Sequence, residues 1–159
     1  MLLFLFMIGF VGNAQQSFDK ASFFASMQSG DLNDIDARLK ILEGSVFPYK
    51  NAYYGALLMK KAGLVEGASN KLRFFKSGRK KLEASIEKNS KNTELRFLRL
   101  MVQEHAPGIL GYKNNEQQDA EYIKKYFKDL PQTVQQAISN YSKQSKILKP
   151  EDFNFDKNE

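Results

Sequence analysis

Residues 95–103 read LRFLRLMVQ, and this stretch decides the fold class. At helical spacing its six apolar side chains wrap most of the circumference, interrupted only by two arginines and a glutamine. A helix that is apolar nearly all round lies inside a bundle, so we expect a central, buried helix here. Asn92 or Thr93 can cap its start, and Pro107-Gly108 ends it.

The segments on either side of this helix also have helical spacing. Apolar positions recur every three or four residues in Phe18–Gln28, from Leu32 to Leu42, after Pro48, from Leu72 to Ile86, from Ala120 to Leu130 and from Pro131 to Tyr141. Short links separate the segments, which favours antiparallel αα-hairpins, and no run alternates with a period of two. The sequence therefore predicts an all-α fold of six or seven helices, packed as consecutive antiparallel hairpins.

The two ends of the chain differ from the predicted domain. Residues 1–14, MLLFLFMIGFVGNA, join an apolar run to a close of small residues, which is typical of a cleaved secretory signal. As a helix this run spans about 15 Å, half of a bilayer core, so no transmembrane segment is expected after cleavage. We predict cleavage after Ala14, a secreted or periplasmic protein, a single domain over residues 15–148, and a polar, frayed tail over 149–159. The alternative for residues 1–14 is a buried N-terminal helix.

The predicted fourth helix carries most of the net charge. Residues 71–88 hold seven basic and two acidic side chains, a local charge of +5 in a chain of +6. On a helical wheel Leu72, Phe75 and Leu82 face inward, and the basic side chains of Arg73, Lys76 and Lys80 lie on the opposite side, with Lys81 further round. The wheel places Glu83 and Glu87 partly on the same outer face and allows a Glu83–Arg79 pair.

Two interpretations of this basic helix remain open. It contacts an anionic partner, such as lipid headgroups, an anionic glycan or an acidic protein, or it is an ordinary solvated helix face. Nucleic acid is not an expected partner, because the predicted signal sends the protein away from it.

The loop after the central helix is the second candidate surface. Ile109, Leu110 and Tyr112 are too apolar for an idle surface loop. We expect them to tuck back between the fifth and sixth helices; the alternative is an exposed anchor for a partner protein.

Few residues offer catalytic or metal chemistry. The chain has no cysteine and one histidine, His105, which stands beside Glu104 at the end of the central helix. A histidine there is favoured simply because it bonds the last carbonyls and suits the helix dipole. The acidic clusters at residues 31–36 and 152–156 lack the glycine and the bidentate glutamate of a calcium loop, so we interpret the first as helix capping and the second as tail. We expect no cofactor and no metal.

A resemblance to tetratricopeptide repeats lies in residues 78–97, GRKKLEASIEKNSKNTELRF. Gly78, Leu82 and Ser85 fall where the junction between adjacent repeats has small, bulky and small residues. Ser90 stands where the repeat has proline, and Arg96 and Arg99 replace apolar residues. Over residues 51–141, with NAYYGALLMKKAGL and ELRFLRLMVQEHAPGILGY, the chain resembles small secreted helical proteins of Bacteroidota-type bacteria. These resemblances imply repeat-like helical hairpins and export, and they imply no activity.

Two functions from different classes are compatible with the sequence. The first is a non-enzymatic helical interaction module of the periplasm or cell exterior, which uses the surface that stacked hairpins create. The second is a small hydrolase or ligand-binding protein with a pocket between helices and a carboxylate such as Glu104 or Asp119. Convergence of His105, Glu104 and a hydroxyl on one pocket would favour the second.

Overall fold

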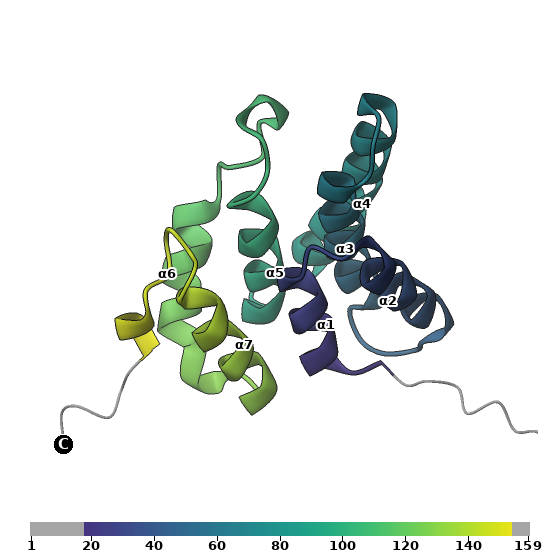
Figure 1. Cartoon of the computed structure of the whole chain (residues 1–159). Coiled ribbons are helices and arrows are strands. Elements are labelled where there is room, and N and C mark those ends of the chain that lie inside the picture. Colours follow the sequence, from purple (N-terminus) through teal and green to yellow (C-terminus); the bar gives the residue numbers. More distant parts are fainter. Residues whose placement is uncertain (1–17, 154–159) are drawn as a thin grey trace, which may run out of the picture.

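The computed structural model describes residues 18–153, and this part of the chain forms seven α-helices and no β-strand (Figure 1). The helices are α1 (Lys20–Gln28), α2 (Leu32–Gly44), α3 (Lys50–Leu64), α4 (Ala68–Lys88), α5 (Thr93–Gln103), α6 (Glu116–Tyr126) and α7 (Gln132–Ser142), and short 3-10 helices cover Gly108–Leu110, Phe127–Asp129 and Pro150–Phe153. Consecutive helices pack against each other, with the largest contact between α3 and α4. The predicted all-α class is confirmed.

Polar side chains at the helix starts explain several of these boundaries. The carboxylate of Asp19 accepts a hydrogen bond from the backbone N–H of Ser22, and that of Asp31 accepts one from Asn33. Asn92 caps α5 in the same way, through the N–H of Leu95. Each cap satisfies an N–H group that has no partner inside its helix. The interpretation of the cluster at residues 31–36 as helix capping is confirmed at Asp31.

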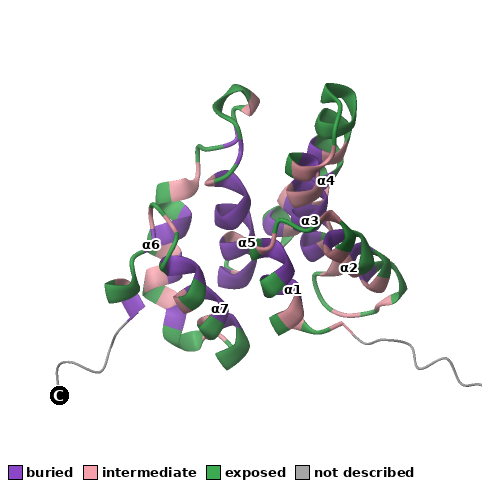
Figure 2. Ribbon diagram, viewed as in Figure 1, coloured by how far each residue is buried: buried purple, intermediate pink, exposed green. Residues whose placement is uncertain are grey.

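Helix α5 lies at the centre of the fold, as its sequence predicts. Figure 2 shows it buried over most of its length, between α6 and α7 on one side and α3 and α4 on the other. Phe97 is fully buried, and its ring centroid lies 5.5 Å from that of Phe24 on α1 and 5.6 Å from that of Tyr141 on α7. Because α1 also packs on α7, the first and last helices meet over the central one.

Two expectations about exposure are wrong. Leu72, expected to face inward, is 42% exposed, because it lies in the first turns of α4, beyond the reach of the core. The stretch from Lys149 was expected to fray, but Pro150–Phe153 forms a 3-10 helix. Phe153 is only 7% exposed, and its ring centroid lies 4.7 Å from that of Phe127, so this part of the tail belongs to the core.

For the residues before Phe18 and after Phe153, the predictions from the sequence remain predictions. The predicted signal and its cleavage after Ala14 lie outside the described residues. Between residues 18 and 153, no helix combines the length and the apolar character that crossing a membrane requires.

Candidate functional site: a basic groove beside helix α4

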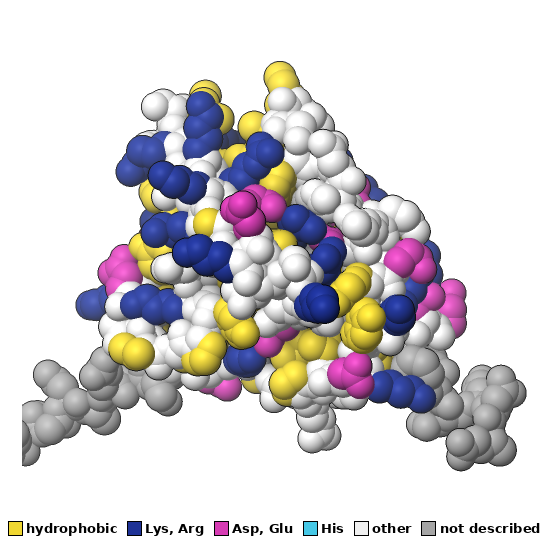
Figure 3. Space-filling view, turned by 180° about the vertical axis from the view of Figure 1, so that it is seen from behind, with side chains coloured by type: hydrophobic (Ala, Val, Ile, Leu, Met, Phe, Trp, Pro, Cys, Tyr) yellow, Lys and Arg dark blue, Asp and Glu magenta, His cyan; other side chains and the backbone are white. Residues whose placement is uncertain are grey.

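A shallow open groove runs along one side of α4, opposite the start of α3. It consists of two adjoining hollows of about 460 and 850 Å³ that share Lys50 and Asn51 of α3 and Ser77 and Lys81 of α4. The segment between α2 and α3 adds Phe47 and Tyr49 to one wall. Figure 3 shows basic side chains gathered over the α4 side of the molecule. We call this feature the basic groove.

Five cationic side chains line the basic groove, and one acidic side chain does. The cations are Lys50, Arg73, Lys80, Lys81 and Lys88, and the acid is Glu43. Within residues 18–153 none of these five cations forms an ion pair with a carboxylate. Charges of one sign along a hollow reinforce each other's potential, so the electrostatic potential in the groove is positive.

The single acidic group, Glu43, offsets one of the five positive charges. The hydroxyl of Tyr54 donates a hydrogen bond of 2.7 Å to the Glu43 carboxylate. Burial and this bond raise the pKa of Tyr54 to about 12, so its proton stays in place at neutral pH. The ammonium group of Lys50 donates to the backbone carbonyls of Glu43 and Ser45, at 2.8 and 3.0 Å, and leaves the carboxylate to Tyr54.

The structure brings three of the four predicted cations together. Arg73, Lys80 and Lys81 line the groove, whereas Lys76 is exposed on α4 outside it. The ammonium nitrogen of Lys81 lies 5.6 Å from the ring centroid of Tyr54, which is within cation–π range. Both residues line the groove. The sequence gives no signal of Lys50 as a member of this set, because it lies on another helix and has no basic neighbour in sequence.

The expected position of the Glu83 side chain is wrong, and its actual position leaves the positive charge of the groove undiminished. The wheel placed it on the outer face, where it would dilute the basic charge, and allowed a pair with Arg79. In the structure its carboxylate turns toward α5 and lies 3.0 Å from a guanidinium nitrogen of Arg99. Arg79 instead lies over the ring of Tyr112, 4.8 Å from its centroid. The negative charge of Glu83 is therefore neutralised away from the groove.

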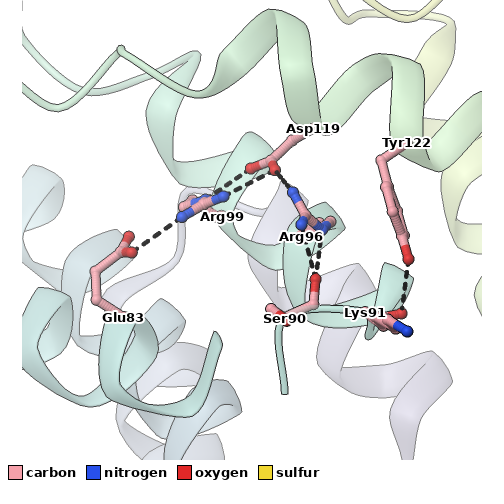
Figure 4. Close-up of polar contacts among 7 residues, drawn as sticks. All are labelled: Glu83, Ser90, Lys91, Arg96, Arg99, Asp119 and Tyr122. Carbon is pink, nitrogen blue, oxygen red and sulfur yellow. Dashed lines mark hydrogen bonds and ion pairs between the residues drawn. The ribbon is translucent and has the colours of Figure 1, made fainter. Parts of the chain in front are cut away.

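Glu83 belongs to a second concentration of charge, the buried cluster shown in Figure 4. At its centre Asp119 of α6 is fully buried and accepts hydrogen bonds from Arg99 at 2.6 and 2.8 Å and from Arg96 at 2.9 Å. Arg96 also donates to the backbone carbonyl of Ser90, at 3.0 and 2.7 Å. The cluster thus ties α4, α5, α6 and the turn before α5 together.

The electrostatics of this cluster are balanced. Burial acts to lower the pKa of Arg99, but the hydrogen bonds and negative charges of Asp119 and Glu83 outweigh it and raise the pKa. Both oxygens of Asp119 are occupied by guanidinium donors, so this carboxylate acts as the counter-ion of two arginines. The arginines that replace apolar residues in the repeat-like sequence find their partners on the next helix.

The apolar loop after α5 is partly buried and partly exposed, so each of the two expected arrangements holds for some of its residues. Tyr112 is buried and tucks back, but it packs on α4, with its ring 5.6 Å from that of Phe75, rather than between α5 and α6. Its hydroxyl donates to Glu83. Leu110 is half-buried against the core, while Ile109 is 94% exposed. Only Ile109 is therefore free to act as the exposed anchor.

Glu104 and His105 lie at the end of α5, away from the two hollows of the basic groove. The Glu104 carboxylate accepts hydrogen bonds of 2.7 Å from the Ser145 hydroxyl and from the backbone N–H of Lys146. The Nδ1 atom of His105 lies 2.9 Å from the carbonyl oxygen of Met101, as expected for a histidine in a last turn. Neither side chain lines the basic groove. Both are engaged at the end of α5, Glu104 with the segment that follows α7.

Between residues 18 and 153, no three acidic or histidine side chains gather where they could hold a metal ion. Compared with known proteins, the chain matches no protein-family model, no curated protein and no solved structure.

Proposed function

We propose that this chain is an exported helical interaction module that binds an anionic partner through the basic groove. The observation that carries the proposal is the set of five groove cations, none of which pairs with a carboxylate within residues 18–153. A helix face that is merely solvated usually alternates its charges with neighbours of opposite sign. Here the lining holds one carboxylate, that of Glu43, against five cations, and Glu83 is paired with Arg99.

The address in this proposal comes from residues 1–14 and their resemblance to a secretory signal. The mature protein would begin at Gln15 and keep its net charge of +6, because residues 1–14 carry no charged side chain. Mass spectrometry of the protein recovered from its native cells tests this. A mature N-terminus at Gln15 supports export, and an exported protein that retains Met1 contradicts cleavage.

Binding of a soluble polyanion tests the groove itself. The groove variant replaces Arg73, Lys80 and Lys88 by Gln. All three are exposed in the structure, so the fold should survive, and Gln keeps a good helix propensity. Its matched control replaces Lys40, Lys125 and Lys146, exposed lysines that do not line the groove, so that both variants carry a net charge of +3, from +6 less three.

We expect the wild type to bind polyglutamate at low salt, with an affinity that falls as salt rises, because screening shortens the reach of the cations. The groove variant should bind much more weakly than the control variant, although the two have the same net charge. Equal loss in both variants would show that binding follows total charge and not the groove, and would overturn the proposal.

A further inference from the structure

Exposed apolar side chains lie beside the basic groove. Among the described residues, Val46 is 99% exposed and Tyr49 is 39% exposed, and both belong to the five-residue segment between α2 and α3. In the same segment, Phe47 and Tyr49 line the hollow that Lys80 and Lys88 border from α4. Four of the groove cations therefore lie on the α4 wall, and the opposite wall joins Lys50 to this apolar segment, which we call the apolar rim.

The backbone of the apolar rim is strained at one point. Tyr49 has a left-handed conformation, with φ of 64° and ψ of 14°, which glycine or asparagine adopts much more easily than an aromatic residue. Its side chain makes no capping hydrogen bond to α3. Strained residues of this kind are typical of functional segments, and tyrosine is a residue that prefers the boundary between water and lipid.

We propose that the anionic partner is the surface of a phospholipid bilayer. The groove cations would bind headgroup phosphates, and Val46 and Tyr49 would enter the boundary between headgroups and acyl chains. The inference rests on the proposed function, since it assigns the partner of the same groove. Basic charge beside exposed apolar side chains is the pattern of proteins that lie on membranes.

Two observations favour lipid over a soluble acidic partner. Val46 has no polar group to offer a glycan or an acidic peptide, and its almost complete exposure leaves its apolar surface in water. The groove is shallow and open, and three of its five cations, Arg73, Lys80 and Lys88, stand on exposed positions along α4, which suits a broad planar surface better than an enclosed ligand. The first observation concerns the apolar rim and the second concerns the groove, so both parts of this surface favour lipid.

Co-sedimentation with two kinds of vesicle tests the lipid partner. The probes are vesicles that contain phosphatidylglycerol and vesicles of phosphatidylcholine alone, with polyglutamate as the soluble anion. We expect the wild type to bind the anionic vesicles and not the neutral ones. A cation near an anionic surface contributes about 1 kcal/mol, or about fivefold in affinity, so the groove variant should lose about a hundredfold.

The rim variant, Val46→Ser, separates lipid from a soluble anion. Val46 is almost fully exposed and lines neither hollow of the groove, so the fold and the groove cations should be kept. We expect this variant to lose about tenfold or more in vesicle binding and to bind polyglutamate like the wild type. Its matched control is Ile109→Ser, which removes an equally exposed apolar side chain from the loop after α5 and should change neither.

Fluorescence gives a second readout of insertion, because the chain contains no tryptophan. A single tryptophan introduced by Val46→Trp should shift its emission to the blue on anionic vesicles and be quenched by brominated lipid. Introduced by Ile109→Trp, it should show neither effect. These spectra do not depend on a loss of binding, so they report insertion even where affinity changes little.

The outcomes separate the two proposals. Binding to polyglutamate that depends on the groove, with no vesicle binding or with vesicle binding unaffected by the rim variant, would overturn the lipid partner and leave the anionic groove in place. Insertion at Ile109 and not at Val46 would also overturn it. If the groove variant and its charge-matched control behave alike with both probes, the proposed function fails and the lipid partner fails with it.

Discussion

Gly55 and Gly78 face each other where α3 packs on α4, so closely that a β-carbon on Gly78 would lie 2.5 Å from the carbonyl oxygen of Gly55. The converse distance, from a β-carbon on Gly55 to the carbonyl oxygen of Gly78, would be 2.6 Å. No side chain separates the two backbones at this point. Tyr54 and Ser77, next to the two glycines in sequence, both line the basic groove, so this contact sets the spacing of its walls.

Gly78→Ala should destabilise the protein although alanine is the better helix former. The added methyl group would meet backbone atoms, which cannot rotate away, so the two helices must move apart. We expect a loss of about 1–3 kcal/mol in the free energy of unfolding, the usual cost of overpacking. Gly63→Ala is the control, because nothing lies within 4 Å of its β-carbon. It should gain about 0.5–1 kcal/mol in urea unfolding, and equal effects would contradict the close contact.

The sequence predicts the local part of this fold well. Helix positions follow from apolar spacing, and Asp31 and Asn92 act as caps because capping depends only on residues two or three positions away. Contacts between distant segments could not be predicted in this way. Leu72 was placed inside by its spacing, but α4 extends beyond the helices that would cover it. Phe153 was placed in a frayed tail, because its partner Phe127 is far away in sequence.

Asp119→Ala should be strongly destabilising. It would leave the guanidinium group of Arg99, only 7% exposed, without its main counter-ion in the core. Breaking a buried pair by removing one partner costs about 3–5 kcal/mol. Glu121→Ala on the same helix, with a side chain 62% exposed, should change stability by about 0.5 kcal/mol or less.

A double variant, Arg99→Met with Asp119→Leu, tests whether the cost comes from the unpaired charge. It should recover much of the stability lost in Asp119→Ala, because apolar residues of similar size can replace a buried pair. Denaturant unfolding of Arg99→Met, of Asp119→Leu and of the double variant gives the coupling free energy between the two side chains. Additive losses would show that Asp119 does not act through Arg99.

The basic groove is only half visible in the sequence. The run of cations from Arg73 to Lys88 marks one wall, and its charge alone makes it visible in the sequence. The other wall comes from Lys50 and Tyr49, and it could not be placed without the packing of α3 on α4. The left-handed conformation of Tyr49 leaves no signal either, since glycine and asparagine are the residues that announce such a position.

Buried tyrosines should make the protein sensitive to alkaline pH. Burial raises the pKa of Tyr53 and of Tyr112 above the ordinary value of 10, and the carboxylates of Glu94 and Glu83 raise them further. Above pH 10 the unfolded chain releases these protons and the folded chain keeps them, so stability is present below pH 10 and is lost as pH rises. Each such tyrosine should remove about 1.4 kcal/mol per pH unit.

Tyr53→Phe tests this dependence through the slope of stability against pH. The variant should be less stable than the wild type at pH 7, because the hydrogen bond to Glu94 is lost. Above pH 10 its free energy of unfolding should fall less steeply than that of the wild type, since one titrating group is gone. Urea unfolding at several pH values between 8 and about 11 measures both slopes. Equal slopes in the two proteins would show that folding does not raise the pKa of Tyr53.

Gln103→Met should stabilise the protein. Gln103 is the last residue of α5 and is fully buried, and its amide nitrogen and oxygen make no hydrogen bond to other groups between residues 18 and 153. A buried polar group without a partner costs about 1–3 kcal/mol, and methionine fills nearly the same volume without a polar atom. We therefore expect a gain within that range in urea unfolding. Gln136→Met on the exposed face of α7 is the control and should change stability by about 0.5 kcal/mol or less. A loss of stability in Gln103→Met would show that the buried amide has a polar partner after all.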